Sequence, residues 1–218
     1  MSRSSKTLRE LTSSLMERQR STLGRSYDGT MGAVTEQLSG SQVRTRNAIL
    51  AATASVIARN RAATLPDIAQ AAGVGRTTVH RYFPDRECLM TRTRADSIRM
   101  LDKAIREAAT DQGPARDAMR RAIAAMASAG DRILFLFDDP AVMRDVPPAE
   151  QPNEDLVLDL IRRGQEEGVF TSDLSVEWIE HTLFALVHWA CRDANAGTLP
   201  RHAVVPTIIR TFEGGCGT

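Results

Sequence analysis

The stretch from Thr64 to Phe83 constrains the fold more than any other part of this 218-residue chain. Thr64-Leu-Pro-Asp67 has the pattern of a capping box, in which Thr64 and Asp67 hydrogen-bond to each other's backbone amides, so a helix should begin there. A glycine after this helix can adopt the positive φ that a sharp turn requires. The inward positions are apolar or small throughout: Ile68, Ala69, Ala72, Gly73, Val74, Val79 and Tyr82. This spacing predicts a helix-turn-helix, with an ordinary helical hairpin as the alternative.

The second helix of this pair should present a short, polar and basic face. Since Val79 and Tyr82 turn inward, the following side chains are left for a partner: Arg76, Thr77, Thr78, His80 and Arg81. Arginine can bridge the two acceptors of guanine, threonine can meet a thymine methyl or a phosphate, and histidine can donate to either. We therefore expect this helix to read double-stranded DNA in the major groove.

Charge is distributed unevenly along the chain, although the formal net charge is only +1. Residues 41–94 hold nine Lys and Arg against three Asp and Glu, whereas residues 95–218 hold thirteen against twenty. A basic segment followed by an acidic one places the polyanion-binding surface in the first of them.

The apolar periodicity is helical nearly everywhere from Gln42 onward, and no alternating strand pattern persists, so an all-α fold is predicted. Residues 1–40 are rich in Ser, Thr and Gly and are expected to form a flexible N-terminal arm. Punctuation by Gly, Pro and Asp divides the remainder into about nine helices: 42–60, 65–72, 76–82, one from after Asp85 to before Gly113, 115–129, 131–138, 153–167, 175–195 and 201–213.

Several functional classes find no support in the sequence. The three cysteines form no CxxC pair, so neither a disulfide framework nor a zinc knuckle is indicated and a reducing cytosol fits best. No stretch approaches the roughly 20 apolar residues of a membrane span, and the N-terminus has no apolar signal core. Catalytic motifs such as GxSxG, GxGxxG, HExxH or a Walker loop do not occur. We expect a cytoplasmic protein with no catalytic site, cofactor or membrane partner.

The segment from Thr64 to Leu89 resembles the DNA-binding signature of the tetracycline-repressor (TetR) family. The resemblance lies in an Ile-Ala pair, an Ala-Gly-Val corner, the Tyr-Phe-Pro sequence that ends at Pro84 and the charged start of the next helix. Gly168-Val-Phe-Thr-Ser-Asp-Leu174 is similar to the family's lead-in to its dimerisation helices. The resemblance implies a sequence-specific transcription regulator, in most relatives a repressor that a small molecule releases from its operator.

The resemblance also implies DNA contacts outside the second helix. Thr64 would anchor a phosphate at a helix N-terminus, and Arg86 would replace the family's Lys in the first turn of the fourth helix. Arg44 and Arg46 would touch the DNA backbone from the start of the first helix. A solvated surface charge is the alternative for each of these arginines.

Two residues depart from the family's usual pattern in the second helix. Gly75 stands where the family has Ser, which is the better N-cap by a few tenths of a kcal/mol. His80 stands where Tyr is common, so the DNA contact at that position can differ or depend on pH. The operator sequence is therefore not fixed by the resemblance.

An apolar cavity between the C-terminal helices is a further implication of the resemblance. For most of the residues that could line it, ordinary core packing is the alternative. Glu177, His181 and His188 share one face of the helix at 175–195, but the two histidines are two turns apart, so no metal site is expected. That face could equally form a polar part of a dimer interface. The candidate effector-binding residues are Met119, Met126, Phe135, Trp178, His181, Phe184 and His188.

The sequence thus predicts a helix-turn-helix DNA-binding domain at 41–84 and a helical effector-binding and dimerisation domain at 85–218. A homodimer joined through the last two long helices would place two reading helices on a near-palindromic operator. The effector is an unidentified small molecule. In the alternative interpretation, a helix-turn-helix regulator or DNA-organising protein responds to a protein partner and has no small-molecule effector.

Overall fold

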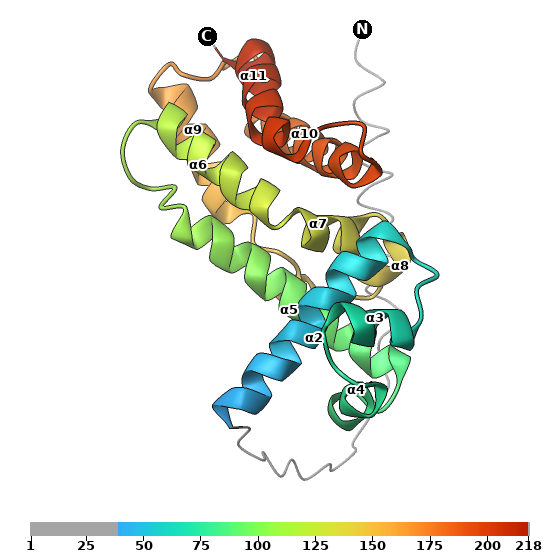
Figure 1. The fold of residues 1–218 in the computed structure, drawn as a ribbon. Helices are drawn as coiled ribbons and strands as arrows, with labels where there is room; N and C mark the ends of the chain where they lie inside the picture. Colours follow the sequence, from blue (N-terminus) through green and yellow to red (C-terminus); the bar gives the residue numbers. More distant parts are fainter. Residues whose placement is uncertain (1–38, 218) are drawn as a thin grey trace, which may run out of the picture. The chain divides into compact units, whose positions relative to one another are not determined.

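The computed structural model describes residues 39–217, whose regular structure is helical apart from one isolated bridge between Phe170 and Gly217 (Figure 1). The expected arm at 1–40 lies outside these residues, except for Ser39 and Gly40. The all-α prediction is confirmed, but the four-residue helix α8 was missed. The helices are α2 (Gly40–Arg59), α3 (Leu65–Ala71), α4 (Arg76–Tyr82), α5 (Arg86–Glu107), α6 (Ala115–Ser128), α7 (Gly130–Phe137), α8 (Pro140–Met143), η1 (Pro148–Glu150), α9 (Asp155–Glu166), α10 (Val176–Ala196), η2 (Arg201–Ala203) and α11 (Val204–Cys216).

Helix α2 begins two residues earlier than expected because Ser39 and Gln42 form a capping box. The Gln42 amide donates to the Ser39 hydroxyl at 3.3 Å, and the Ser39 amide donates to Gln42 Oε1 at 2.6 Å. Ala52 and Val56 of α2 are only partly buried. The buried residues are Ile49, Leu50, Thr53, Ala54 and Ile57.

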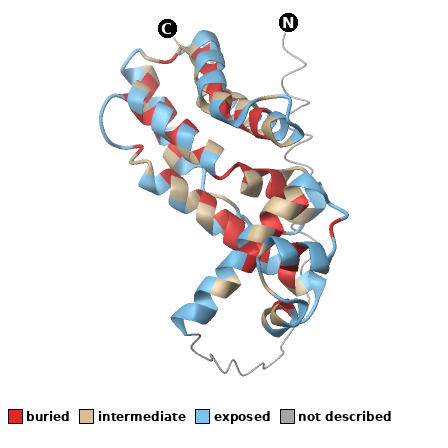
Figure 2. Ribbon diagram, viewed as in Figure 1, coloured by how far each residue is buried: buried red, intermediate tan, exposed pale blue. Residues whose placement is uncertain are grey.

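The first four helices enclose a core of their own. Ile68 and Leu89 are fully buried there, and Figure 2 shows buried residues concentrated where these helices meet. This arrangement fixes α3 and α4 against α2 and the start of α5. The cluster consists of Ile49, Leu50, Ile68, Ala69, Val79, Phe83 and Leu89.

A second cluster joins α2 and α5 to α7. It consists of Ala54, Ile57, Ala63, Ile98, Phe135 and Leu136. Two ion pairs border it: Arg59 on α2 with Asp131 on α7 at 3.3 Å, and Asp96 on α5 with Arg132 on α7 at 2.6 Å. The helix-turn-helix is therefore connected to the C-terminal helices mainly through α7.

The largest core lies between α5, α6, α7, α9, α10 and α11. Gly164 allows α9 to approach the ring of Phe170, which packs edge-to-face on Phe212 of α11 with 5.6 Å between ring centroids. Ser175 caps α10 by accepting from the Trp178 amide at 3.2 Å. α10 and α11 consequently pack side by side at the end of this part of the chain farthest from α4 (Figure 1).

Helix α10 corrects one expectation about its faces. Ile179, Leu183, Val187 and Cys191 form its buried face. Trp178 and Trp189, whose usual place is the core, are instead 60% and 59% exposed. When a helix has two apolar faces, the apolar periodicity does not show which face packs in the core and which is exposed. No helix within residues 39–217 has the length and apolar character to cross a membrane.

Candidate DNA interface and effector cavity

The turn between α3 and α4 is a Schellman motif centred on Gly73. Gly73 has φ +67°, its amide donates to the Gln70 carbonyl at 3.1 Å, and the Val74 amide donates to the Ala69 carbonyl at 3.0 Å. A Cβ at this position would meet no heavy atom within 4 Å, so the backbone angle alone selects glycine. The predicted glycine corner is confirmed.

Helix α4 is held by its inner side. Val79 and Phe83 are 1% and 2% exposed, and Tyr82 packs half-buried beside them. The guanidinium of Arg81 lies 5.4 Å from the centre of the Tyr82 ring. These contacts fix the outward direction of the remaining side chains of α4.

The outward face of α4 carries the predicted DNA-reading residues. Thr78 is half-buried, while the others are exposed: Arg76, Thr77, His80 and Arg81. Neither arginine has a carboxylate partner within residues 39–217. Gly75 caps the helix through its carbonyl, which accepts from the Thr78 amide at 2.9 Å, and it supplies no side-chain acceptor. The face is therefore free to pair with phosphates and base edges.

The start of α3 is reinforced by a carboxylate. Asp67 accepts from both the backbone amide and the hydroxyl of Thr64, each at 2.7 Å. These bonds, the amide first, lower the pKa of Asp67 below its ordinary value. The predicted capping box is present, although the Thr64 hydroxyl donates to the carboxylate instead of standing free for a phosphate.

The peripheral arginines differ in what surrounds them. Arg44 is exposed and Arg46 is half-buried on α2. Arg86 donates to the Ala63 carbonyl at 2.8 Å, so its guanidinium also braces the loop between α2 and α3. A phosphate contact for each of the three stays a prediction.

A small cavity of about 60 Å³ lies between α5, α6, α7, α9 and α10. Phe137 and Phe184 meet edge-to-face in its wall, with 4.8 Å between ring centroids. Three carboxylates also line it, from Asp102, Glu154 and Glu180. Burial, followed by the charge of Glu154, raises the pKa of Glu180 above its ordinary value. An apolar cavity with several acidic groups suits a cationic ligand.

The structure brings together only two of the predicted effector-binding residues, Met126 and Phe184, in this cavity. Met119 and Phe135 are 2% exposed in other parts of the core. Sequence reasoning missed the acidic residues because Asp102, Glu154 and Glu180 come from separate segments that only the fold unites.

Three predicted residues of α10 lie outside the cavity. Trp178 and His181 are exposed and, with Trp189, line an apolar groove between α10 and α11. His188 Nε2 lies 2.8 Å from Asp138 Oδ1, which ties α10 to the end of α7. Within residues 39–217, no three His, Cys, Asp or Glu side chains are placed to hold a metal ion.

The comparisons with known proteins agree with this geometry. The sequence profile described as "Bacterial regulatory proteins, tetR family" matches residues 49–93, which span the helix-turn-helix. The HTH-type transcriptional repressor LfrR of Mycolicibacterium smegmatis is 32% identical over 179 residues, 81% of this chain and 93% of that protein. The chain belongs to the TetR family. The resemblance inferred from Thr64 to Leu89 is thereby confirmed, and the chain is a DNA-binding transcriptional regulator.

Solved structures of TetR-family proteins extend the likeness beyond the DNA-binding segment. LfrR from Mycobacterium smegmatis in complex with proflavine has a TM-score of 0.66 and 31% identity, covering 82% of this chain and 99% of that one. The ketosteroid transcriptional regulator KstR2 of Mycobacterium tuberculosis has a TM-score of 0.58 at 18% identity, covering 85% and 100%, and shares the fold. Both the DNA-binding and the C-terminal helices of this TetR-family chain are therefore of the family's type.

Proposed function

We propose that this chain is a repressor that binds a near-palindromic operator through α4 and leaves it when a small molecule occupies the cavity beside Glu180. The observation that carries the DNA part is the exposed basic face of α4, whose two arginines have no carboxylate partner within residues 39–217. In this proposal residues 41–84 form the DNA-binding domain and residues 85–218 the effector-binding and dimerisation domain. The protein would act in the cytoplasm, where bacterial DNA lies.

Operator binding tests the assignment of the α4 face. The variant Arg76→Ala with Thr78→Ala should lose specific binding of a labelled operator, measured by fluorescence anisotropy, because base-edge and phosphate contacts disappear together. Arg106→Ala, which removes an exposed arginine on α5, is the matched control and should bind normally. Normal operator affinity in the double variant would reject α4 as the reading helix.

The exposed groove between α10 and α11 supports dimerisation through these helices. Two tryptophans more than half exposed on one helix are unusual on the surface of a monomer. A second copy related by a two-fold axis would cover both, and would place two α4 helices about 34–36 Å apart for successive major grooves. Trp189→Glu should shift the mass measured by light scattering from dimer to monomer, whereas Glu177→Gln on the same helix should not. A dimeric Trp189→Glu variant would exclude this interface.

For the effector we propose a planar aromatic cation. The related LfrR is known in complex with proflavine, which belongs to this chemical class. In this chain the cavity offers Phe137 and Phe184 for stacking and the carboxylates of Asp102, Glu154 and Glu180 for the charge.

The size of the cavity supports a link between effector binding and release. Its volume of about 60 Å³ is far below the roughly 300 Å³ at which small-molecule pockets begin, so an aromatic effector must push the surrounding helices apart. α5 borders the cavity at Leu101 and Ile105 and runs from there into the helix-turn-helix. Only a ligand that favours the opened form can shift the equilibrium away from the DNA-binding form.

Proflavine fluorescence tests the effector assignment directly. Titration of the full chain should give saturable binding, and Glu180→Gln should weaken it about tenfold because a half-buried charge partner is lost. Glu177→Gln, at an exposed position of α10, is the matched control. Proflavine should also release labelled operator from the wild-type chain. Binding that is equal in both variants would remove Glu180 and its cavity from the proposal.

A further inference from the structure

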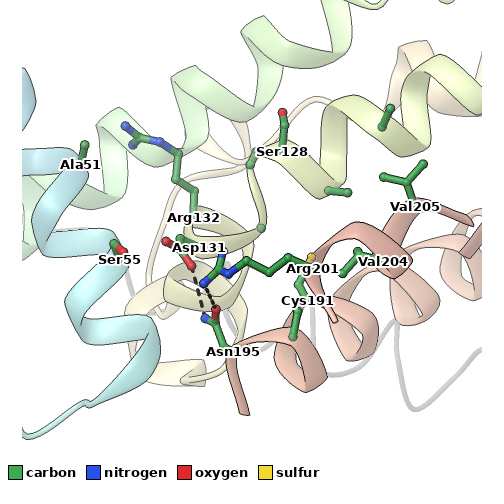
Figure 3. Close-up of a pocket in the computed structure, with 15 residues that line it drawn as sticks. Ala51, Ser55, Ser128, Asp131, Arg132, Cys191, Asn195, Arg201, Val204 and Val205 are labelled. Atoms are coloured by element: carbon green, nitrogen blue, oxygen red, sulfur yellow. Dashed lines mark hydrogen bonds between the residues drawn. The ribbon is translucent and has the colours of Figure 1, made fainter. Parts of the chain in front are cut away.

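A second and larger cavity lies where α2 meets the C-terminal helices (Figure 3). Its volume is about 590 Å³, within the usual range for small-molecule sites. α2 contributes Ala51 and Ser55, the turn from α6 into α7 contributes Ser128, and Asn195 and Arg201 come from α10 and η2. This junction cavity shares no lining residue with the cavity beside Glu180.

Within residues 39–217 a single carboxylate lines the junction cavity, and each of its two oxygens accepts a hydrogen bond. Asp131 Oδ2 accepts from Arg59 at 3.3 Å, and Oδ1 accepts from Asn195 Nδ2 at 3.2 Å. Arg201 donates to Asn195 Oδ1 at 3.4 Å and has no carboxylate partner within residues 39–217. Asp131 is thus neutralised, while the guanidinium of Arg201 lies at the same polar end of the cavity uncompensated (Figure 3).

The surroundings add further positive charge. Arg132, the other lining arginine, shares the carboxylate of Asp96 with Arg99, so one acid serves two guanidiniums. Burial raises the pKa of the Cys191 thiol to about 11, so this lining group stays neutral at neutral pH. Among residues 39–217, two arginines and one carboxylate line the junction cavity, and that carboxylate is paired with Arg59, so the lining carries a net positive charge.

The rest of the wall is apolar and built from small side chains. Val204 and Val205 of α11 lie opposite the turn of α6, and alanines of α2, α6 and α10 leave the space between them open. An occupant therefore needs an apolar body as well as an acidic group. Arginine binds carboxylates through paired hydrogen bonds. An inorganic ion of the size of phosphate could also make these bonds, but it would leave the apolar part of the cavity empty.

We propose that the junction cavity is a second ligand site, which binds a small aromatic carboxylate with its acid group on Arg201 and its ring against Val204 and Val205. The occupant contacts α2 and the α10–η2 segment simultaneously, so its binding changes the affinity for the operator. This coupling depends on the proposed DNA-binding role of α4, whereas binding of the carboxylate does not.

Calorimetry with benzoate on the full chain tests the site, with benzamide as the neutral isostere and benzamidine as the cation, all at one ionic strength. Benzoate should bind measurably and the other two should not. Arg201→Gln should weaken benzoate binding about fivefold or more. Arg106→Gln removes an exposed arginine remote from the junction cavity and should leave the affinity unchanged.

A second variant tests the apolar part of the site. Ala51 is exposed on α2 and lines the cavity, so Ala51→Phe should narrow it and reduce benzoate binding while the circular dichroism melt stays that of a folded protein. Absence of benzoate binding, equal binding of benzamide, or full affinity in Arg201→Gln would each overturn the site. If the wild-type chain binds operator normally and also binds benzoate, but benzoate leaves the operator Kd unchanged, the coupling is overturned and the ligand site is not.

Discussion

The carboxylate of Asp96 on α5 lies 2.6 Å from the guanidinium of Arg132 on α7, and the two side chains are only 6% and 15% exposed. Arg132 also donates to the Ser97 hydroxyl at 3.4 Å. This pair lies beside the apolar cluster that joins α2 and α5 to α7. It therefore fixes α5 against α7.

Removal of one partner should be costly. Arg132→Ala leaves Asp96 buried with only the exposed Arg99 as partner, and we expect a loss of about 3 kcal/mol in the free energy of unfolding. Urea unfolding would measure it. Arg162→Ala breaks the exposed Arg162–Asp159 pair and should cost less than about 1 kcal/mol. Equal losses of unfolding free energy in the two variants would mean that the buried pair stabilises the chain no more than the exposed pair does.

The corner glycine is expected to resist substitution for a backbone reason alone. Gly73→Ala forces an L side chain to φ +67° and should cost about 1–2 kcal/mol, although the site has room for a methyl group. Gly75→Ser is the matched control, since Gly75 has φ −74° and serine is the better N-cap there. Thermal unfolding should show a lower Tm only for the first variant. An unchanged Tm in Gly73→Ala would contradict the positive φ.

A steric prediction concerns α9. A Cβ on Gly164 would overlap the ring of Phe170, so Gly164→Ala should destabilise the chain by about 1–3 kcal/mol. Phe170→Leu in the same chain should relieve part of that loss, which a double-mutant cycle in urea would reveal. Gly214→Ala on α11 meets no neighbour within 4 Å and should not destabilise. Strict additivity of the two substitutions would argue against the contact.

The acid in the small cavity should make stability depend on pH. Burial raises the pKa of Glu180 above its ordinary value of 4.5, so the folded chain holds that proton more tightly than the unfolded chain. The stability associated with the protonated form is complete below pH 4.5 and is lost as the pH rises through the raised pKa. Glu180→Gln should therefore gain Tm relative to wild type between pH 4 and pH 7. Glu177→Gln should show no such trend, and a flat difference for Glu180→Gln would refute the shift.

Much of the DNA-binding part could be predicted from the sequence because its determinants are local. A capping box at Thr64 and Asp67, a glycine corner at Gly73 and an inward spacing that ends at Tyr82 each depend on residues a few positions apart. Hydrogen bonds within one helix turn and a single backbone angle fix them. The outward direction of Arg76 and its neighbours follows from the same spacing.

Only the tertiary structure decided the rest, because the deciding contacts join residues far apart in the chain. Trp178 has the same apolar character whether a core or a second surface covers it, and its exposure depends on how α10 packs. Glu180 becomes part of a cavity only when Asp102 and Glu154 are brought beside it. Arg86 and Arg201 are both simply charged residues in the sequence. The fold places a backbone carbonyl beside Arg86, whereas Arg201 has no carboxylate partner within residues 39–217. Helical periodicity specifies which side chains share a face, whereas burial and charge pairing depend on what other helices place against that face.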